Sequence, residues 1–166
     1  MNVQAARIVE TLGLIPLPHE GGFFAPTWSS AAELASGRRA GSAIYFLVTP
    51  AGFSALHRLR TGEVWCFHAG DPVDHCQLGN DGRGTKVTRL GADVLHGQTP
   101  QVAVNGGVWQ GARLALDGAV GWALMSCFMA PAWDEREFEL GSRADLLREF
   151  PAASVWIHGL TRLEAI

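Results

Sequence analysis

Residues 52–70 read GFSALHRLRTGEVWCFHAG, two hydrophobic runs joined by a short turn. Side chains alternate between the two faces of a β-strand, so Glu63, Trp65 and Phe67 share one face of the second run. His57 lies on the first run, six residues before Glu63. If both sets face inward, a histidine and a carboxylate meet in an apolar interior, where a buried charge needs a partner. The stretch therefore predicts a polar corner between two strands of a β-protein.

The chain after residue 42 continues in the same style, with short runs rich in β-branched and aromatic residues and bounded by Gly, Pro, Asn or Asp. Short strands spaced about 8–12 residues apart are typical of an all-β sandwich or barrel. We expect a barrel over about residues 20–131. The runs are 42–49, 53–59, 63–69, 73–79, 85–91, 100–105, 108–116 and 120–130.

Helical patterns flank the predicted barrel. Apolar residues at helical spacing end at Gly13 and predict a helix over about residues 2–12. Ser142 is a candidate N-cap, with Asp145 three residues later, and predicts helix over about residues 142–163. We expect both helical segments to pack on the outside of the barrel. No linker or internal repeat interrupts the 166 residues, so we expect one domain over 1–166.

Composition excludes several classes of partner. The chain is 48% hydrophobic and 17% charged, with a formal net charge of −3, as expected of a globular protein. No run of Lys or Arg indicates a nucleic-acid or membrane-surface partner, and no apolar run reaches the roughly 20 residues of a membrane span. The three cysteines form no CxxC pair, which favours free thiols and a cytoplasmic protein.

Residues 52–70 resemble the first motif of the cupin superfamily, which runs glycine, histidine, any residue, histidine, then glutamate and a final glycine. His57, Glu63 and Gly70 match the first histidine, the glutamate and the final glycine, whereas Leu59 replaces the second histidine. The segment NGGVWQ is similar to the second motif, but there Gln110 replaces the histidine.

Longer segments look more specifically like the fifth cupin family, a subgroup of uncharacterised function, and cover nearly the whole chain. They are PHEGGFF, SAIYFLVTP, GEVWCFHAGDP, GGVWQGARL and FELGSRADLLREFP. The resemblance implies a cupin-type jelly-roll β-barrel with short N-terminal and C-terminal helices. The superfamily includes metal-dependent dioxygenases and decarboxylases, metal-free sugar-nucleotide epimerases and seed storage proteins.

A metal-dependent cupin holds its ion with three histidines and one glutamate. This chain offers His57 and Glu63, with Gln110 as a weak oxygen ligand and Leu59 as none. Loss of even a supporting group around a metal weakens affinity by about 10–100-fold. We therefore expect no cofactor and no metal bound at high affinity. Weak binding of a divalent ion by His57, Glu63 and Gln110 remains open.

The same corner predicts a pocket for a small-molecule ligand, with His57 and Glu63 as the catalytic residues. His57 would be a general base, with its imidazole oriented by Glu63. The predicted ligand-binding residues are Tyr45, Trp65, Phe67, Trp109 and Gln110. Glu20, before two glycines, is either a carboxylate at the barrel mouth or part of a simple turn.

Three functions remain open at this point. One is isomerase or epimerase-like chemistry on a sugar or nucleotide sugar, for which Tyr45 is the candidate second acid. Another is a binding or structural cupin without catalysis. The third is a metal-dependent oxygenase or decarboxylase with a degenerate site, which Leu59 and Gln110 disfavour.

The strand that begins near residue 42 is apolar on both faces, with Ala43, Tyr45 and Leu47 on one of them. A barrel strand with two apolar faces needs cover on its outer side, and a partner subunit is a common cover. We therefore expect a homodimer, with the terminal helices as the competing cover. The same apolar patch contains Val64 and Cys66.

Overall fold

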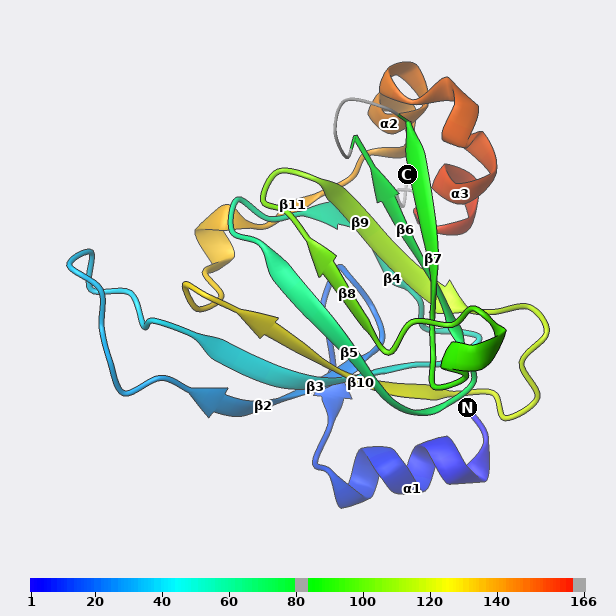
Figure 1. Ribbon diagram of the computed structural model, residues 1–166, viewed down its shortest axis with the longest axis horizontal. Coiled ribbons are helices and arrows are strands. Elements are labelled where there is room, and N and C mark those ends of the chain that lie inside the picture. Colours follow the sequence, from blue (N-terminus) through cyan, green and yellow to red (C-terminus); the bar gives the residue numbers. More distant parts are fainter. Residues whose placement is uncertain (80–83, 163–166) are drawn as a thin grey trace.

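Two antiparallel β-sheets enclose the core of the protein (Figure 1). The computed structural model describes residues 1–79 and 84–162. The six-stranded sheet has the order β1-β2-β3-β10-β5-β8, and its strands are β1 (Ile15–Pro16), β2 (Phe23–Ser29), β3 (Ser42–Val48), β5 (Glu63–Gly70), β8 (Gln101–Val104) and β10 (Ala123–Met129). The five-stranded sheet has the order β11-β4-β9-β6-β7, and its strands are β4 (Ser54–Arg58), β6 (Val73–Leu78), β7 (Thr85–Leu90), β9 (Trp109–Leu114) and β11 (Glu139–Leu140). The all-β prediction is confirmed.

Short helices lie at both ends of the chain (Figure 1). The α-helices are α1 (Val3–Thr11), α2 (Arg143–Glu149) and α3 (Ser154–Gly159), and the 3₁₀ turns are η2 (Val94–His96), η3 (Glu135–Glu137) and η4 (Pro151–Ala153). Ser142 caps α2 as expected, since its side chain accepts a hydrogen bond from the Asp145 amide. The predicted helix over 142–163 is wrong as one element, because Pro151 lacks an N–H and breaks it into α2, η4 and α3. Its last predicted residue, 163, lies outside the described residues.

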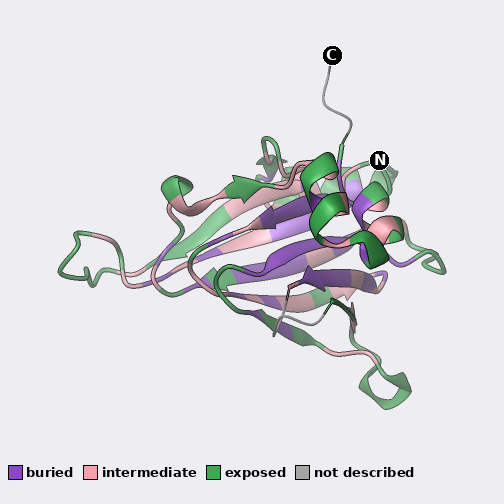
Figure 2. Ribbon diagram, turned by 90° about the horizontal axis from the view of Figure 1, so that it is seen from above, coloured by how far each residue is buried: buried purple, intermediate pink, exposed green. Residues whose placement is uncertain are grey.

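The apolar interior is divided into two clusters. The inner cluster fills the space between the sheets and includes Phe46, Trp65 and Val73. The outer cluster lies on the other face of the five-stranded sheet, where residues such as Leu56 pack against Ile157 of α3. Figure 2 shows buried strands at the centre of the molecule and exposed loops around them. The C-terminal helices therefore cover the outside of the five-stranded sheet, as expected.

In the described part of the chain no helix is long and apolar enough to cross a membrane. Cys66, Cys76 and Cys127 are free thiols. The cytoplasmic location inferred from these thiols stays a prediction.

The chain passes from one sheet to the other at Gly70, the last residue of β5. Its φ of +101° is favourable only for glycine, and a Cβ there would lie 2.9 Å from the Cα of Ala123 and would clash with the carbonyl oxygen of Trp122. This close approach accounts for the final glycine of the first motif.

We expect Gly70→Ala to lower the free energy of unfolding by about 2–5 kcal/mol, the sum of a left-handed backbone and a steric clash. Gly37→Ala is the matched control, because Gly37 has a φ of +79° but open space around it. It should cost only about 1–2 kcal/mol. Denaturant unfolding measures the free energy of unfolding of both variants. Equal losses of stability would show that the close contact of Gly70 with β10 does not add to the cost.

Candidate functional site

A buried carboxylate connects the two sheets inside the barrel. Oε2 of Glu63 accepts hydrogen bonds from Nε1 of Trp65 (3.1 Å) and from Nε2 of Gln110 (2.7 Å). The Trp65 indole also donates to Oε1 of Gln110, at 2.9 Å. Glu63 and Trp65 belong to β5 of the six-stranded sheet and Gln110 to β9 of the five-stranded sheet. This triangle therefore ties the sheets together through polar groups.

His57 lies directly beside Gln110 on the neighbouring strand β4, and its side chain is 2% exposed. Its Nδ1 is 2.8 Å from the carbonyl oxygen of Ala55. A carbonyl oxygen can only accept, so Nδ1 carries a proton, and in the neutral form of the ring the lone pair lies on Nε2. The ring of Phe138 stacks on the imidazole, with centroids 5.4 Å apart and planes 24° apart. The orientation of His57 is thus fixed by its neighbours.

A second carboxylate approaches His57 from the loop before β2. Oε1 of Glu20 accepts a hydrogen bond from Oγ of Ser54 (2.7 Å) and lies 3.9 Å from Nδ1 of His57. Positive φ angles at Gly21 and Gly22, +98° and +73°, turn the chain back sharply enough to point the carboxylate inward. Of the two interpretations left open by the sequence, the structure favours the carboxylate at the barrel mouth.

The loop that carries Glu20 is anchored by an arginine from the far end of the chain. The Arg162 guanidinium donates to the carbonyl oxygens of His19 (3.1 Å), Glu20 (2.7 Å) and Phe53 (3.1 Å), and lies 4.3 Å from the centroid of the Phe53 ring. Any side chain at Gly21 would clash with this guanidinium. No local pattern in the sequence indicated this contact.

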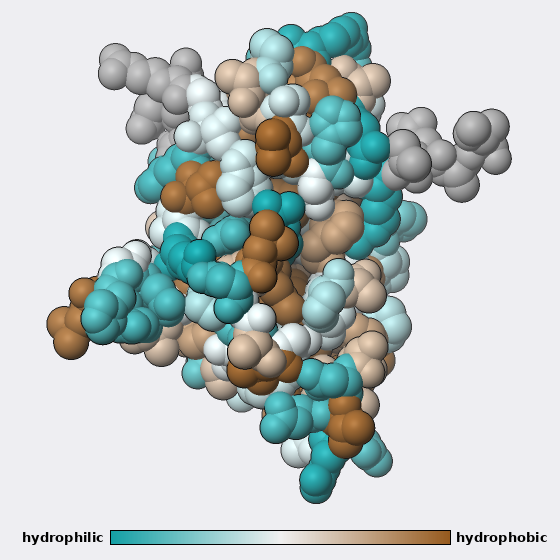
Figure 3. All heavy atoms as spheres, turned by 90° about the vertical axis from the view of Figure 1, so that its right-hand side faces the viewer, coloured by the Kyte–Doolittle hydropathy of each residue, from teal (hydrophilic) through white to brown (hydrophobic). Residues whose placement is uncertain are grey.

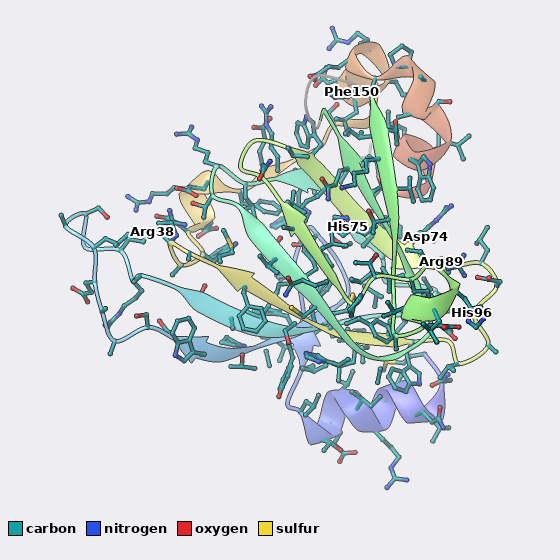
Figure 4. The ribbon with its side chains drawn as sticks, viewed as in Figure 1. Arg38, Asp74, His75, Arg89, His96 and Phe150 are labelled. Carbon is teal, nitrogen blue, oxygen red and sulfur yellow. The ribbon has the colours of Figure 1, made fainter. Side chains whose placement is uncertain are left out.

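His75 of β6 lies inside the barrel and is fully buried (Figure 4). Its ring meets the Trp65 ring edge to face, with centroids 5.0 Å apart. Among the described residues neither of its ring nitrogens has a hydrogen-bond partner. Burial, with a smaller contribution from the charge of His57, lowers the pKa of His75 to about 3, so its imidazole is neutral at pH 7. His75 was not among the site residues predicted from the sequence.

Burial shifts the pKa of Glu63 in the opposite direction to that of His75. Removal from water raises the pKa of its carboxyl from 4.5 to about 7, and the negative charge of Glu20 adds to this rise. The charge of His57 and the hydrogen bonds from Gln110 and Trp65 lower the pKa again, but by less. At neutral pH the Glu63 carboxyl is therefore near the midpoint of its titration, which suits a group that gives and takes protons.

The structure brings together some of the predicted site residues and separates others. His57, Glu63, Trp65 and Gln110 form one cluster, whereas Phe67 packs against the inner apolar core.

Trp109 was wrongly assigned to the pocket. It precedes Gln110 on β9 and therefore points to the opposite face, where it joins the outer cluster and lies under the Arg58 guanidinium at 4.6 Å. Tyr45 was also wrongly assigned to the pocket. Its ring is 6.2 Å from that of the exposed His68, while its neighbour Phe46 fills the core.

The predicted orienting role of Glu63 is also wrong. Nδ1 of His57 faces the Ala55 carbonyl and the Glu20 carboxylate, and the hydrogen bonds of Glu63 go to Trp65 and Gln110 instead. Glu20 therefore occupies the place next to the imidazole that was expected for Glu63.

The cluster does not fit a metal ion. Two N–H donors point at Oε2 of Glu63, and the Gln110 amide turns its nitrogen, not its oxygen, toward the carboxylate. A cation there would face N–H groups in place of lone pairs. Within residues 1–79 and 84–162, no three His, Cys, Asp or Glu side chains are grouped so that they could hold a metal. The expectation that the protein needs no metal stays a prediction.

A groove of about 610 Å³ lies beside this cluster, outside the barrel. Ala55 lines it, but His57, Glu63 and Gln110 do not. Its walls are His19, Ala55, Leu140, Gly141, Ser142, Arg143, Ala144, Leu147, Thr161 and Arg162.

The two facing sheets, with the polar cluster of His57, Glu63 and Gln110 between them, define a β-barrel protein. The sequence pattern described as Cupin superfamily (DUF985) matches residues 6–141, so the chain belongs to this family. No protein with a curated description matches the chain.

Two solved structures resemble the chain over almost its full length. A hypothetical protein from Leishmania major is 32% identical, with 96% of this chain and 99% of that chain covered and a TM-score of 0.87. A protein from Shewanella oneidensis is 29% identical, with 99% of each chain covered and a TM-score of 0.87.

A more distant structure extends the likeness in fold alone. Oxalate decarboxylase from Bacillus subtilis is 11% identical, with 92% of this chain and 41% of that chain covered and a TM-score of 0.54.

The opposite pKa shifts of Glu63 and His75 predict a cancellation in the pH dependence of stability. Between pH 4.5 and 6.5 the folded protein keeps a proton on Glu63 that the unfolded chain has lost, so stability falls as pH rises. Over the same range the unfolded chain protonates His75 and the folded protein does not, so stability rises with pH. Each slope is about 1.4 kcal/mol per pH unit, with opposite sign.

Single variants should expose the two slopes. Glu63→Gln should become more stable as pH rises from about 3 to 6.5, and His75→Leu less stable as pH rises from about 4.5 to 7. Urea unfolding at a series of pH values measures both. Slopes of the same sign in the two variants would contradict the assignment.

We also expect the wild type to purify with much less than one metal ion per chain. Leu59→His combined with Gln110→His removes the amide donor and places two imidazoles near His57 and Glu63, a ligand set suited to zinc or manganese. Elemental analysis, together with melting with and without divalent ions, tests this. A double variant without bound metal would show that Leu59 does not converge on the site.

Proposed function

We propose that this cupin binds a small polar molecule in the barrel and that His57 and Glu63 exchange protons with it. The carrying observation is the Glu63 carboxyl, which is buried, has a pKa of about 7 and is held by hydrogen bonds from Trp65 and Gln110. A group that titrates near the working pH is effective both as acid and as base.

The two residues have different tasks in this proposal. His57 holds its Nδ1 proton against the Ala55 carbonyl, so Nε2 is the basic atom that accepts a proton from the ligand. Glu20, 3.9 Å from Nδ1, stabilises the imidazolium that results. Protonated Glu63 then supplies the acid, a role for which the sequence suggested Tyr45. The Gln110 amide holds the Glu63 carboxyl in place.

An acid and a base around one small site suit removal and return of a proton beside a carbonyl or hydroxyl group. This is the chemistry of isomerases and epimerases, so the proposed ligands are sugars, sugar phosphates and nucleotide sugars. One observation favours a second function, ligand binding without turnover: His57 and Glu63 are only 2% and 8% exposed, so a ligand must reach them from a closed interior.

A ligand panel tests the proposal. We expect at least one member of a set of monosaccharides, sugar phosphates and nucleotide sugars to raise the melting temperature. Saturation at 100 times Kd adds about 2.7 kcal/mol of stability. In D₂O, NMR should show exchange of one carbon-bound proton of that compound, about 100-fold slower or more in His57→Asn.

The control variant is Trp109→Phe, which alters a tryptophan of the outer cluster and should leave binding and exchange unchanged. Binding without exchange in the wild type would favour the non-catalytic function. Equal exchange in the wild type and in His57→Asn would remove His57 from the chemistry. A panel without any stabilising compound would contradict the ligand class.

A further inference from the structure

The groove beside the Glu20 loop carries positive charge without acidic residues in its walls. Of the described residues that line it, none is an Asp or Glu, whereas Arg143 and Arg162 both line it. This composition contrasts with that of the whole chain, which has 16 acidic residues, 13 basic residues and a net charge of −3. A concave surface with charges of one sign attracts ligands of the opposite sign.

Arg143, the first residue of α2, is held in place by neutral acceptors. Its Nε donates to Oγ1 of Thr161 (2.7 Å), and its Nη2 donates to the carbonyl oxygen of Thr161 (2.5 Å). Thr161 is itself fixed, because its hydroxyl donates to the carbonyl oxygen of Ile157 (2.6 Å). Within residues 1–79 and 84–162, no carboxylate forms an ion pair with Arg143, and its Nη1 has no acceptor. The guanidinium is therefore oriented while its charge is still uncompensated.

Arg162, the residue after Thr161, shows the same pattern. Its guanidinium donates to the carbonyl oxygens of His19, Glu20 and Phe53, and among the described residues it forms no ion pair. Burial lowers the pKa of Arg162, and the negative charge of Glu20 offsets this only in part. The positive charge is therefore less well stabilised than in water, and an anion in the groove would stabilise it.

Several other arginines on the surface have a carboxylate partner. Arg58 pairs with Glu139 (2.7 Å), and Arg136 pairs with Asp134 (2.6 Å). The face shown in Figure 3 is also mixed, with hydrophobic residues in small groups separated by hydrophilic ones, as on an ordinary surface. The groove, with two arginines that lack a carboxylate partner in the described part of the chain, differs from such a surface.

The rest of the groove suits an organic molecule better than an inorganic ion. Leu140 and Leu147 supply apolar surface, and Leu140 is 43% exposed. The volume of about 610 Å³ lies within the range of about 300–1,000 Å³ that is usual for small-molecule sites. His19 in the wall has a φ of +63°, a conformation that is uncommon for residues other than glycine and that is found at functional sites.

We infer that this groove binds a small organic anion, whose carboxylate or phosphate group contacts Arg143 and Arg162 and whose apolar part lies on Leu140. A guanidinium presents paired N–H donors that match two oxygens of a carboxylate or a phosphate. Because hydrogen bonds to the protein already hold both arginines, little side-chain freedom is lost when the anion binds.

Titration of the full chain with phenyl phosphate and with benzoate, followed by calorimetry and amide NMR, tests the inference. Benzyl alcohol is the neutral control probe. We expect at least one of the two anions to bind about 10-fold or more tightly than benzyl alcohol, because hydrogen bonds to a charged group are the stronger ones. The anion that binds more tightly identifies the preferred acidic group.

NMR also separates this site from the ligand site proposed inside the barrel. The amide shifts caused by the anion should be centred on Ala144 and Thr161, which line the groove. Shifts centred on the Trp65 indole N–H, which lies in the barrel cluster, would place the anion inside the barrel and overturn the inference.

Two variants each make the groove more negative by one charge. Arg143→Met and Ala144→Glu should both weaken binding by about 10-fold or more. Ala144 is exposed in the first turn of α2, where a glutamate is favourable, so Ala144→Glu keeps the test valid even if Arg143→Met misfolds.

Arg148→Met is the matched control. Arg148 lies on the same helix and its loss changes the net charge equally, but it pairs with Asp145 and does not line the groove. Its affinity for the anion should equal that of the wild type. A wild type that binds neither anion would overturn the inference. So would a folded Ala144→Glu variant that binds as tightly as the Arg148→Met control.

Discussion

The Glu63 carboxylate has to be satisfied inside an apolar barrel, and the polar interior is arranged around that requirement. An unpaired buried charge would cost several kcal/mol, far more than a typical hydrogen bond returns. Trp65 supplies one donor from the same strand and Gln110 supplies another from the opposite sheet. The distance between the sheets is therefore set at this point by directional bonds, and a second polar bond crosses between the sheets from Nε2 of Gln77 on β6 to the carbonyl oxygen of Ala103 on β8.

Local alternation accounts for most of what the sequence could reveal about the site. His57, Glu63 and Trp65 face inward because each lies at the correct parity in a short strand next to a turn, and no distant contact is needed to predict this. The same rule shows why the pocket could not contain both Trp109 and Gln110, which are adjacent on one strand. The prediction placed Trp109 and Gln110 in one pocket, although adjacent residues of a strand point to opposite faces of the sheet.

Other parts of the site depend on contacts between distant segments. Glu20 lies beside His57 because the loop that carries it is anchored by Arg162, and the Phe138 ring reaches the imidazole from a segment after the last long strand. No periodicity links such positions. His75 is a different case, since the alternation of β6 does place it inward, but its two unpartnered nitrogens become evident only in three dimensions.

The anchoring of the Glu20 loop has a consequence for the order in which the protein assembles during synthesis. The hydrogen bond from Arg162 to the Glu20 carbonyl spans 142 residues, so the loop leaves the ribosome long before the arginine that anchors it. A nascent chain can pair its strands and bury its apolar core while the carboxylate beside His57 is still unplaced. The position of the Glu20 carboxylate beside His57 is therefore fixed only after the strands of both sheets have been made.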